Sequence, residues 1–154
     1  MSHLIATFFY IGHLRPAPGT WGSLAALVLG FTIIQTTGVY GLCIAIITSC
    51  VLGWWATAAQ TKGEDDHDPS EIVIDEVAGQ WIAILPLAIS PQPYEISLWY
   101  WLLAFAVFRL FDITKLGLVG WADRQTGPIG VMLDDIIAGL MTAAVIVLVM
   151  ISLS

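Results

Sequence analysis

The chain has 154 residues, of which 58% are hydrophobic and only 11% are charged. A soluble domain usually carries a charged fraction of about 25%, so this composition excludes an ordinary soluble protein and predicts one integral membrane domain over residues 1–154. The net charge of −7, from 12 acidic and 5 basic residues, argues against nucleic acid as a partner, because nucleic-acid binding needs a basic face.

Five apolar segments follow in chain order, and none alternates between apolar and polar residues as a half-buried strand would. They are 21–36, 39–59, 77–89, 98–113 and 131–153. The second and fifth are long enough to cross a bilayer, which takes about 20 residues. The third contains Pro86 and has only 13 residues, which indicates a broken, tilted or protein-buried helix. We therefore predict an all-α, multi-pass membrane bundle with about four to five membrane-associated helices.

The polar connections predict the orientation of this bundle. If all five segments cross the membrane, three polar stretches lie on the same side: 1–20, 60–76 and 112–130. Every lysine and arginine of the chain lies on or beside that side, and the positive-inside rule makes it cytoplasmic. Among the charged residues, only Glu95 falls on the opposite side. We expect any charged site to face the cytoplasm.

An acidic pair followed closely by Ala-Gly occurs twice in the chain. The stretch IVIDEVAG contains Asp75-Glu76, and VMLDDIIAG contains Asp134-Asp135. Each pair is expected to open a helix on the cytoplasmic side, about one turn from its start. We therefore expect carboxylates from two helices at one cytoplasmic mouth.

The glycines after the acidic pairs suggest how these two helices meet. Asp75 and Gly79 are spaced i, i+4, as are Asp135 and Gly139, so each carboxylate shares a helix face with a glycine. Small residues let membrane helices approach closely. The sequence predicts that the two helices pack at these glycines.

The acids have two interpretations. Several carboxylates within about 4–6 Å cannot all stay ionised without a cation, and oxygen-only ligands suit Mg²⁺. Alternatively, acids in a first helical turn stabilise the helix dipole by about 0.3–1 kcal/mol each. Capping does not explain the further acids nearby, so we predict a Mg²⁺ site at Asp75, Glu76, Asp134 and Asp135. Adjacent helical residues point about 100° apart, so we expect Asp135 to be a direct ligand and Asp134 to reach a second metal or a basic partner.

Basic residues in FRLFDITK (108–115) suggest phosphate binding. Arg109, Asp112 and Lys115 are spaced i, i+3 and i+6, at a cytoplasmic helix end. The two cations could clamp a phosphate while Asp112 turns to the metal. The alternative is an intrahelical ion pair between Arg109 and Asp112.

Two loops complete the set of candidate residues. In EDDHDPSE (64–71), His67-Asp68 is a candidate general acid/base or outer metal partner, whereas Asp65 and Asp66 fit a solvated loop. In RPAPGTWGSL (15–24), the glycines allow a tight turn into the first helix, with Thr20 or Ser23 as its cap. A helix N-terminus of this kind binds anions.

Together these stretches resemble the phosphatidylglycerophosphatase A family of bacterial inner-membrane lipid phosphatases. The motifs are APGTWGSL, HDPSEIVIDEVAGQWI, FRLFDITK, ADR and GVMLDDIIAG, in this order over nearly the whole chain. The resemblance implies Mg²⁺-dependent removal of the terminal phosphate from phosphatidylglycerophosphate, a membrane phospholipid, to give phosphatidylglycerol. It carries the family's charged motif positions to Asp68, Asp75, Glu76, Arg109, Asp112, Lys115, Asp123, Arg124, Asp134 and Asp135.

These observations lead to a hypothesis of metal-assisted phosphomonoester hydrolysis at the cytoplasmic leaflet, with either water or an aspartate as nucleophile. We expect the catalytic residues to be His67, Asp68, Arg109, Asp112 and Lys115. We expect the phosphate to be bound by Gly19, Thr20, Arg109, Lys115 and Arg124. The alternative from another class is a small cation transporter or channel subunit, which would need carboxylates near mid-membrane. A phosphotransferase using a nucleotide-activated lipid would need a spaced Asp/Gly signature that the sequence lacks.

Overall fold

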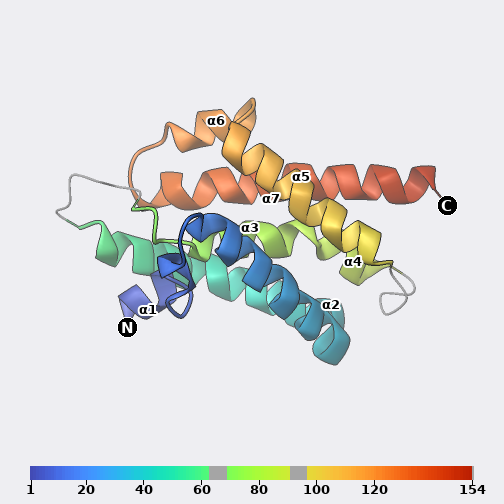
Figure 1. The fold of residues 1–154 in the computed structure, drawn as a ribbon, viewed down its shortest axis with the longest axis horizontal. Helices are drawn as coiled ribbons and strands as arrows, with labels where there is room; N and C mark the ends of the chain where they lie inside the picture. Colours follow the sequence, from blue (N-terminus) through green and yellow to red (C-terminus); the bar gives the residue numbers. More distant parts are fainter. Residues whose placement is uncertain (63–68, 91–96, 154) are drawn as a thin grey trace.

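The computed structural model of the chain describes residues 1–62, 69–90 and 97–153, and within these ranges every regular element is a helix (Figure 1). The elements are α1 (Ser2–Ala6), the 3₁₀ helix η1 (Ile11–His13), α2 (Pro18–Gln60), α3 (Ile74–Ala83), α4 (Leu85–Ile89), α5 (Leu98–Thr114), α6 (Leu118–Asp123) and α7 (Pro128–Ser152). The prediction of an all-α fold is confirmed.

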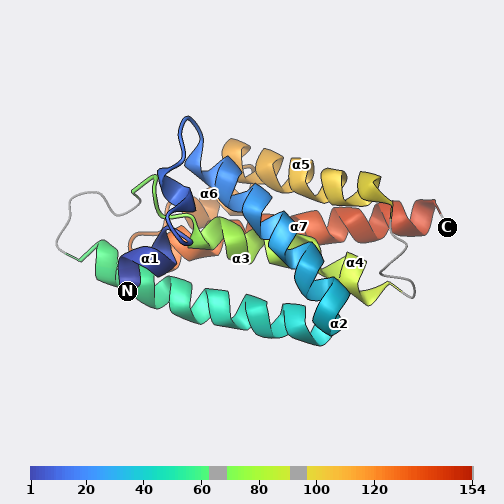
Figure 2. The same cartoon turned by 60° about the horizontal axis from the view of Figure 1, so that its bottom comes forward.

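Helix α2 contains the first two predicted segments as two arms joined at Gly38. The backbone there has φ 67° and ψ −160°, a conformation that favours glycine, and Figure 2 shows the arms running in opposite directions. The break between the predicted segments 21–36 and 39–59 is thus confirmed at Gly38. The predicted cap is wrong, because α2 already begins at Pro18 and no side chain caps it. Ser23 instead donates from Oγ to the carbonyl oxygen of Gly19 at 2.8 Å.

Helix α3 lies at the centre of the bundle, between α2 and α7 (Figures 1 and 2). Nine of its ten residues are buried, including Asp75. The helix ends at Ala83, and α4 follows with Pro86 in its first turn. The third predicted segment is therefore a broken, protein-buried helix, one of the forms predicted from its length and its proline.

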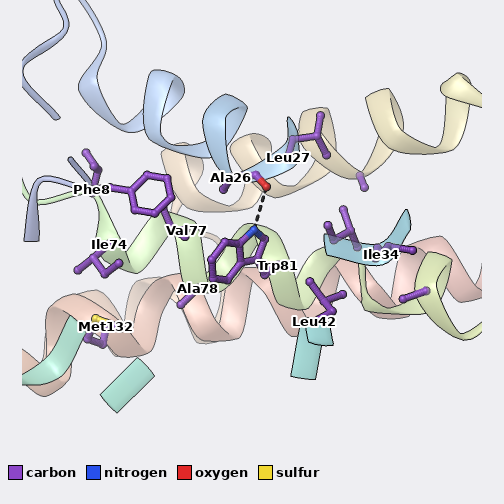
Figure 3. Packing of buried hydrophobic residues seen from close by; sticks show 14 of the residues in the cluster. Phe8, Ala26, Leu27, Ile34, Leu42, Ile74, Val77, Ala78, Trp81 and Met132 are labelled. Atoms are coloured by element: carbon purple, nitrogen blue, oxygen red, sulfur yellow. Dashed lines mark hydrogen bonds between the residues drawn. The ribbon is translucent and has the colours of Figure 1, made fainter. Parts of the chain in front are cut away.

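A buried tryptophan connects α3 to the first arm of α2. Trp81 Nε1 donates a hydrogen bond of 2.8 Å to the carbonyl oxygen of Ala26, as Figure 3 shows. The indole also meets the ring of Phe8 edge to face, at 6.3 Å between centroids. Aliphatic side chains from α2, α3 and α7 complete this core around the indole, so the position of α3 is set from several sides.

Two glycines set the distance between α3 and α7. A Cβ atom placed on Gly139 would overlap the carbonyl oxygen of Gly79 and lie 3.1 Å from its Cα. A Cβ on Gly79 would lie 2.6 Å from the ring of Phe108. Only glycine permits this approach, so the predicted contact between the two acid-bearing helices is confirmed.

Helix α7 begins earlier than the sequence analysis predicted. Its first residue is Pro128, preceded by Gly127 at φ 78°, and no acid lies in its first turn. Asp134 is therefore about 9 Å along the helix, at 1.5 Å per residue, rather than one turn from its start. The expectation that the acidic pair opens this helix is wrong.

The polar connections gather at one end of the bundle. Figures 1 and 2 place the N-terminal segment, the end of α2, the start of α3, α6 and the start of α7 at this end, and the turn of α2, α4 and the C-terminus at the other. Among the described residues, α2 and the helix from Pro128 to Leu153 are long and apolar enough to cross a membrane. The arrangement matches the predicted grouping of the three polar stretches.

Candidate active site at the polar end of the bundle

Three carboxylates converge where α3 meets α7. Asp75, Glu76 and Asp135 each offer an oxygen, and these oxygens all lie within 4.8 Å of one another. The contact between the two helices brings Asp135 to the first turn of α3. Asp135 Oδ1 and Glu76 Oε2 are buried and have no hydrogen-bond partner among the described residues.

This group fits a hard divalent cation. A buried carboxylate oxygen without a donor is costly, and Mg²⁺ takes oxygen ligands of this kind. Stabilisation of the helix dipole accounts for Asp75 and Glu76, which lie in the first turn of α3, but not for the acids of α7, which lie beyond its first turn. The donor set is therefore one that a bound Mg²⁺ would satisfy.

Asp134 faces a different partner from Asp135. Its Oδ2 accepts a hydrogen bond from Lys115 Nζ, which also lies 3.3 Å from Asp112 Oδ1 and 3.4 Å from Asp123 Oδ1. Burial lowers the pKa of Lys115, but the hydrogen bond and charge of Asp134, with the charges of Asp135 and Asp112, outweigh it and raise the pKa above its usual 10.5. Lys115 therefore stays protonated at neutral pH, and Asp134 reaches a basic partner, one of the two roles expected for it.

Arg109 connects three helices beside the acidic group. Its Nη1 pairs with Asp112 on the same helix, lies 3.9 Å from Glu76 Oε1 on α3, and donates to Ser23 Oγ on α2 at 3.3 Å. The intrahelical ion pair considered as an alternative is thus present. Arg109 Nε is buried and has no partner among the described residues, so the guanidinium retains a donor.

A cleft of about 300 Å³ joins these groups. Its charged lining consists of Asp75, Glu76, Arg109, Asp112, Lys115, Asp134 and Asp135. The volume is at the lower end of the range of about 300–1,000 Å³ for small-molecule sites. Five carboxylates against two cations leave an excess of negative charge, so an anionic substrate needs an additional cation to bind there.

The other predicted site residues differ in whether they line the cleft. Gly19 lines the cleft, whereas Thr20 does not belong to its lining. Arg124 is exposed at the C-terminal end of α6, outside the cleft lining, so its proposed phosphate contact stays a prediction. His67 and Asp68 lie outside the described residues.

Some polar residues at or near the site were missed by the sequence analysis. Ser70 lines the cleft, and Ser23, expected only as a cap, bonds to Arg109. Gln80 is fully buried on α3, and neither of its amide atoms has a partner among the described residues. Its position one turn after Glu76, in an otherwise apolar helix, is the signal that could have identified it.

Comparison with known proteins adds the evolutionary relationship. Residues 4–150 match the family described as Phosphatidylglycerophosphatase A. The chain belongs to the phosphatidylglycerophosphatase A family. This is the family that the motifs resembled, and its name describes phosphatases that act on a phospholipid.

Three relatives cover most of the chain. The Phosphatidylglycerophosphatase A of Haemophilus influenzae is 36% identical over 94% of this chain and 85% of its own length. The protein of the same name from Escherichia coli K12 is 32% identical over 94% of this chain and 80% of its own length. A Bacteroides thetaiotaomicron protein provisionally named phosphatidylinositol-3-phosphatase is 36% identical over 88% and 85%. No solved structure matches the chain.

Proposed function

We propose that this chain is a multi-pass membrane enzyme that hydrolyses phosphatidylglycerophosphate to phosphatidylglycerol and inorganic phosphate with Mg²⁺. The observation that carries the proposal is the juxtaposition, in one cleft, of buried unpaired carboxylate oxygens with Arg109 and Lys115. Membership of the phosphatidylglycerophosphatase A family supports the substrate.

The proposed metal ligands are Asp75, Glu76 and Asp135, whose oxygens already lie within 4.8 Å of one another. When bound there, Mg²⁺ would offset the negative excess of the cleft and supply an activated water at neutral pH. Asp134 contributes indirectly, because it holds the ammonium of Lys115. The proposal thus has three metal ligands and one positioning residue, where the sequence predicted four ligands.

The two cations of the cleft are suited to a phosphate monoester. Lys115 carries a charge held by acids on three sides, and Arg109 has a buried donor without a partner. Fixed cations stabilise the charge that develops on the equatorial oxygens of a transferring phosphoryl group. As water attacks phosphorus, the ester P–O bond to the glycerol breaks and the released alkoxide takes up a proton.

The proposed location is the bacterial inner membrane, with the cleft facing the cytoplasm. The two span candidates, α2 and α7, bury only 28% and 22% of their most apolar windows inside the protein. Such large exposed apolar surfaces are covered by lipid in a membrane protein. A cleft at the end of the bundle lies where a phospholipid headgroup would meet it.

The test is phosphate release by the purified protein in mixed micelles that contain phosphatidylglycerophosphate, with and without Mg²⁺. We expect release that depends on Mg²⁺ and stops with excess chelator. Phosphatidylinositol 3-phosphate and phosphatidic acid serve as comparison substrates, the first because of the name of the Bacteroides relative. No Mg²⁺-dependent release from any of the three lipids would contradict the proposed function, and a preference for another lipid would contradict only the substrate.

The same preparation tests the alternative of a cation transporter. Proteoliposomes loaded with a Mg²⁺-sensitive dye would report cation flux, which the present proposal predicts to be absent. The acids of the cleft lie in the first turn of α3, in the last turn of α5 and towards the start of α7, whereas a transport path requires polar groups through the membrane centre.

A further inference from the structure

A second polar cluster lies at the same end of the bundle but outside the cleft. Its centre is a pair of imidazoles, with His3 Nε2 only 3.1 Å from His13 Nε2. His3 belongs to α1 and His13 ends η1. The residues between them include Phe8, Phe9 and Tyr10, three consecutive residues with positive φ, and this left-handed turn brings the two histidines together.

Each imidazole has a polar neighbour at its other nitrogen. Gln60, at the end of α2, donates from Nε2 to Ser2 Oγ at 2.9 Å, so its Oε1 faces His3 Nδ1 at 3.0 Å as an acceptor. A neutral His3 therefore carries its proton on Nδ1, and its lone pair is left on Nε2. His13 Nδ1 lies 3.7 Å from Glu71 Oε2, an ion-pair distance beyond that of a hydrogen bond.

The two Nε2 atoms lie 3.1 Å apart, a distance at which they share either a proton or a metal ion. The separation is close to that of a metal site, because two nitrogens bound to one tetrahedral Zn²⁺ at about 2.0–2.1 Å lie roughly 3.3 Å apart. Metal-bound histidines typically donate their other N–H to a carboxylate or carbonyl oxygen, as Gln60 Oε1 provides for His3.

We propose that His3 and His13 bind a Zn²⁺ ion at this position. Imidazole nitrogens favour Zn²⁺ over Mg²⁺, so the site differs in metal preference from the all-oxygen group of the cleft. A polar cavity of about 370 Å³, lined by His3, Thr7, Gln60 and Glu71 among others, lies beside His3 and would supply water as a further ligand.

The bound ion would fasten the N-terminal segment to the chain that leads into α3. Figure 2 shows α1 lying against the second arm of α2. Val73 N donates to the carbonyl oxygen of Ala6 at 2.9 Å, one residue before α3 begins. The zinc site would therefore be structural, joining four segments without contributing a ligand to the cleft.

The test is a Zn²⁺ titration of the full-length protein in detergent after removal of metals, monitored by competition with a chromophoric chelator in millimolar Mg²⁺. We expect one Zn²⁺ per chain. The substitutions His3→Asn and His13→Asn should each weaken Zn²⁺ binding at least about tenfold. Gln60→Leu removes an outer partner of His3 and should weaken Zn²⁺ binding about tenfold. Asp135→Asn is the matched control and should leave the Zn²⁺ affinity unchanged.

X-ray absorption at the zinc edge of the unaltered protein keeps the test independent of how the variants fold. We expect two nitrogen scatterers with imidazole signatures at about 2.0–2.1 Å. No Zn²⁺ binding would mean that the two rings share only a proton, and would overturn the proposal. Equal binding by the His3→Asn variant, or loss of binding in Asp135→Asn, would overturn it as well, and none of these outcomes bears on the phosphatase activity.

Discussion

The adjacent residues Asp134 and Asp135 of α7 face different groups. Asp135 is 3% exposed and leaves Oδ1 unpaired in the acidic group, whereas Asp134 is hydrogen-bonded to Lys115. The 100° between neighbouring helical residues turns one carboxylate to α3 and the other to the end of α5. The pair thus combines a proposed ligand with a residue that positions a cation.

The Asp134–Lys115 pair predicts an interaction that a double-mutant cycle can detect. Lys115→Met leaves a buried carboxylate without its partner, a change that typically costs about 3–5 kcal/mol. We expect a clear fall in the thermal unfolding midpoint, measured in detergent, for Lys115→Met and for Asp134→Asn alone. The double variant should recover part of that loss, because it leaves no uncompensated charge.

Asp123→Asn is the matched control for this cycle. Its side chain is 42% exposed and 3.4 Å from Lys115 Nζ, so its loss should cost below about 1 kcal/mol. Strictly additive effects of the Lys115 and Asp134 substitutions would show that the pair is not coupled.

The sequence predicted separate roles for Asp134 and Asp135 but did not identify Lys115 as the partner of Asp134. Lys115 was expected at a helix end with Arg109 and Asp112; α5 ends at Thr114, and Lys115 is left-handed at φ 49°. That conformation ends the helix next to α7, a tertiary arrangement that spacing along the chain does not contain.

At the scale of the elements, the close packing of α3 and α7 creates the site. The i, i+4 spacing of acid and glycine predicted this contact, and Gly79 and Gly139 meet as expected. The apolar run begins only at Val131, whereas α7 begins at Pro128, because proline is favourable at a first helical position. Apolar runs in the sequence thus predict where the helices lie, whereas proline and glycine residues determine where the helices begin and end.

Gly139→Val tests the contact between the helices. Its branched side chain would overlap the backbone of Gly79 and push α7 away from the first turn of α3. Overpacking of this kind costs about 1–3 kcal/mol, and the separation should also abolish phosphate release.

The control substitution is Ala144→Val, on an exposed face of the same helix. It should change neither the unfolding midpoint nor the activity. Near-normal activity of the Gly139→Val variant would show that the close approach is not required for the site.

Across the whole molecule, the charged residues that the structure describes lie towards one end of the bundle. Composition and charge placement predicted this arrangement, because charged residues are costly within a membrane. The central position of α3 was less predictable. Its short length indicated burial, but the partners that surround it follow from the way α2 folds back and α7 packs.

Cysteine labelling tests the proposed orientation. In a background with Cys43→Ser and Cys50→Ser, we would introduce Thr61→Cys at the polar end and, separately, Ser90→Cys at the other end. A membrane-impermeant maleimide applied to intact bacteria should label only the Ser90→Cys variant, and both variants after permeabilisation. Labelling of only the Thr61→Cys variant in intact cells would show the opposite orientation and contradict the proposal.

The most direct test of the proposed metal site is the dependence of phosphate release on Mg²⁺ concentration, measured in parallel for the unaltered protein and Asp135→Asn. For the unaltered protein, we expect release that rises to saturation with Mg²⁺. For Asp135→Asn, folded and inserted to the same level, we expect release at background throughout, because the buried oxygen pair at Glu76 and Asp135 is broken. A saturating, near-normal Mg²⁺ response from Asp135→Asn would contradict the proposed metal site.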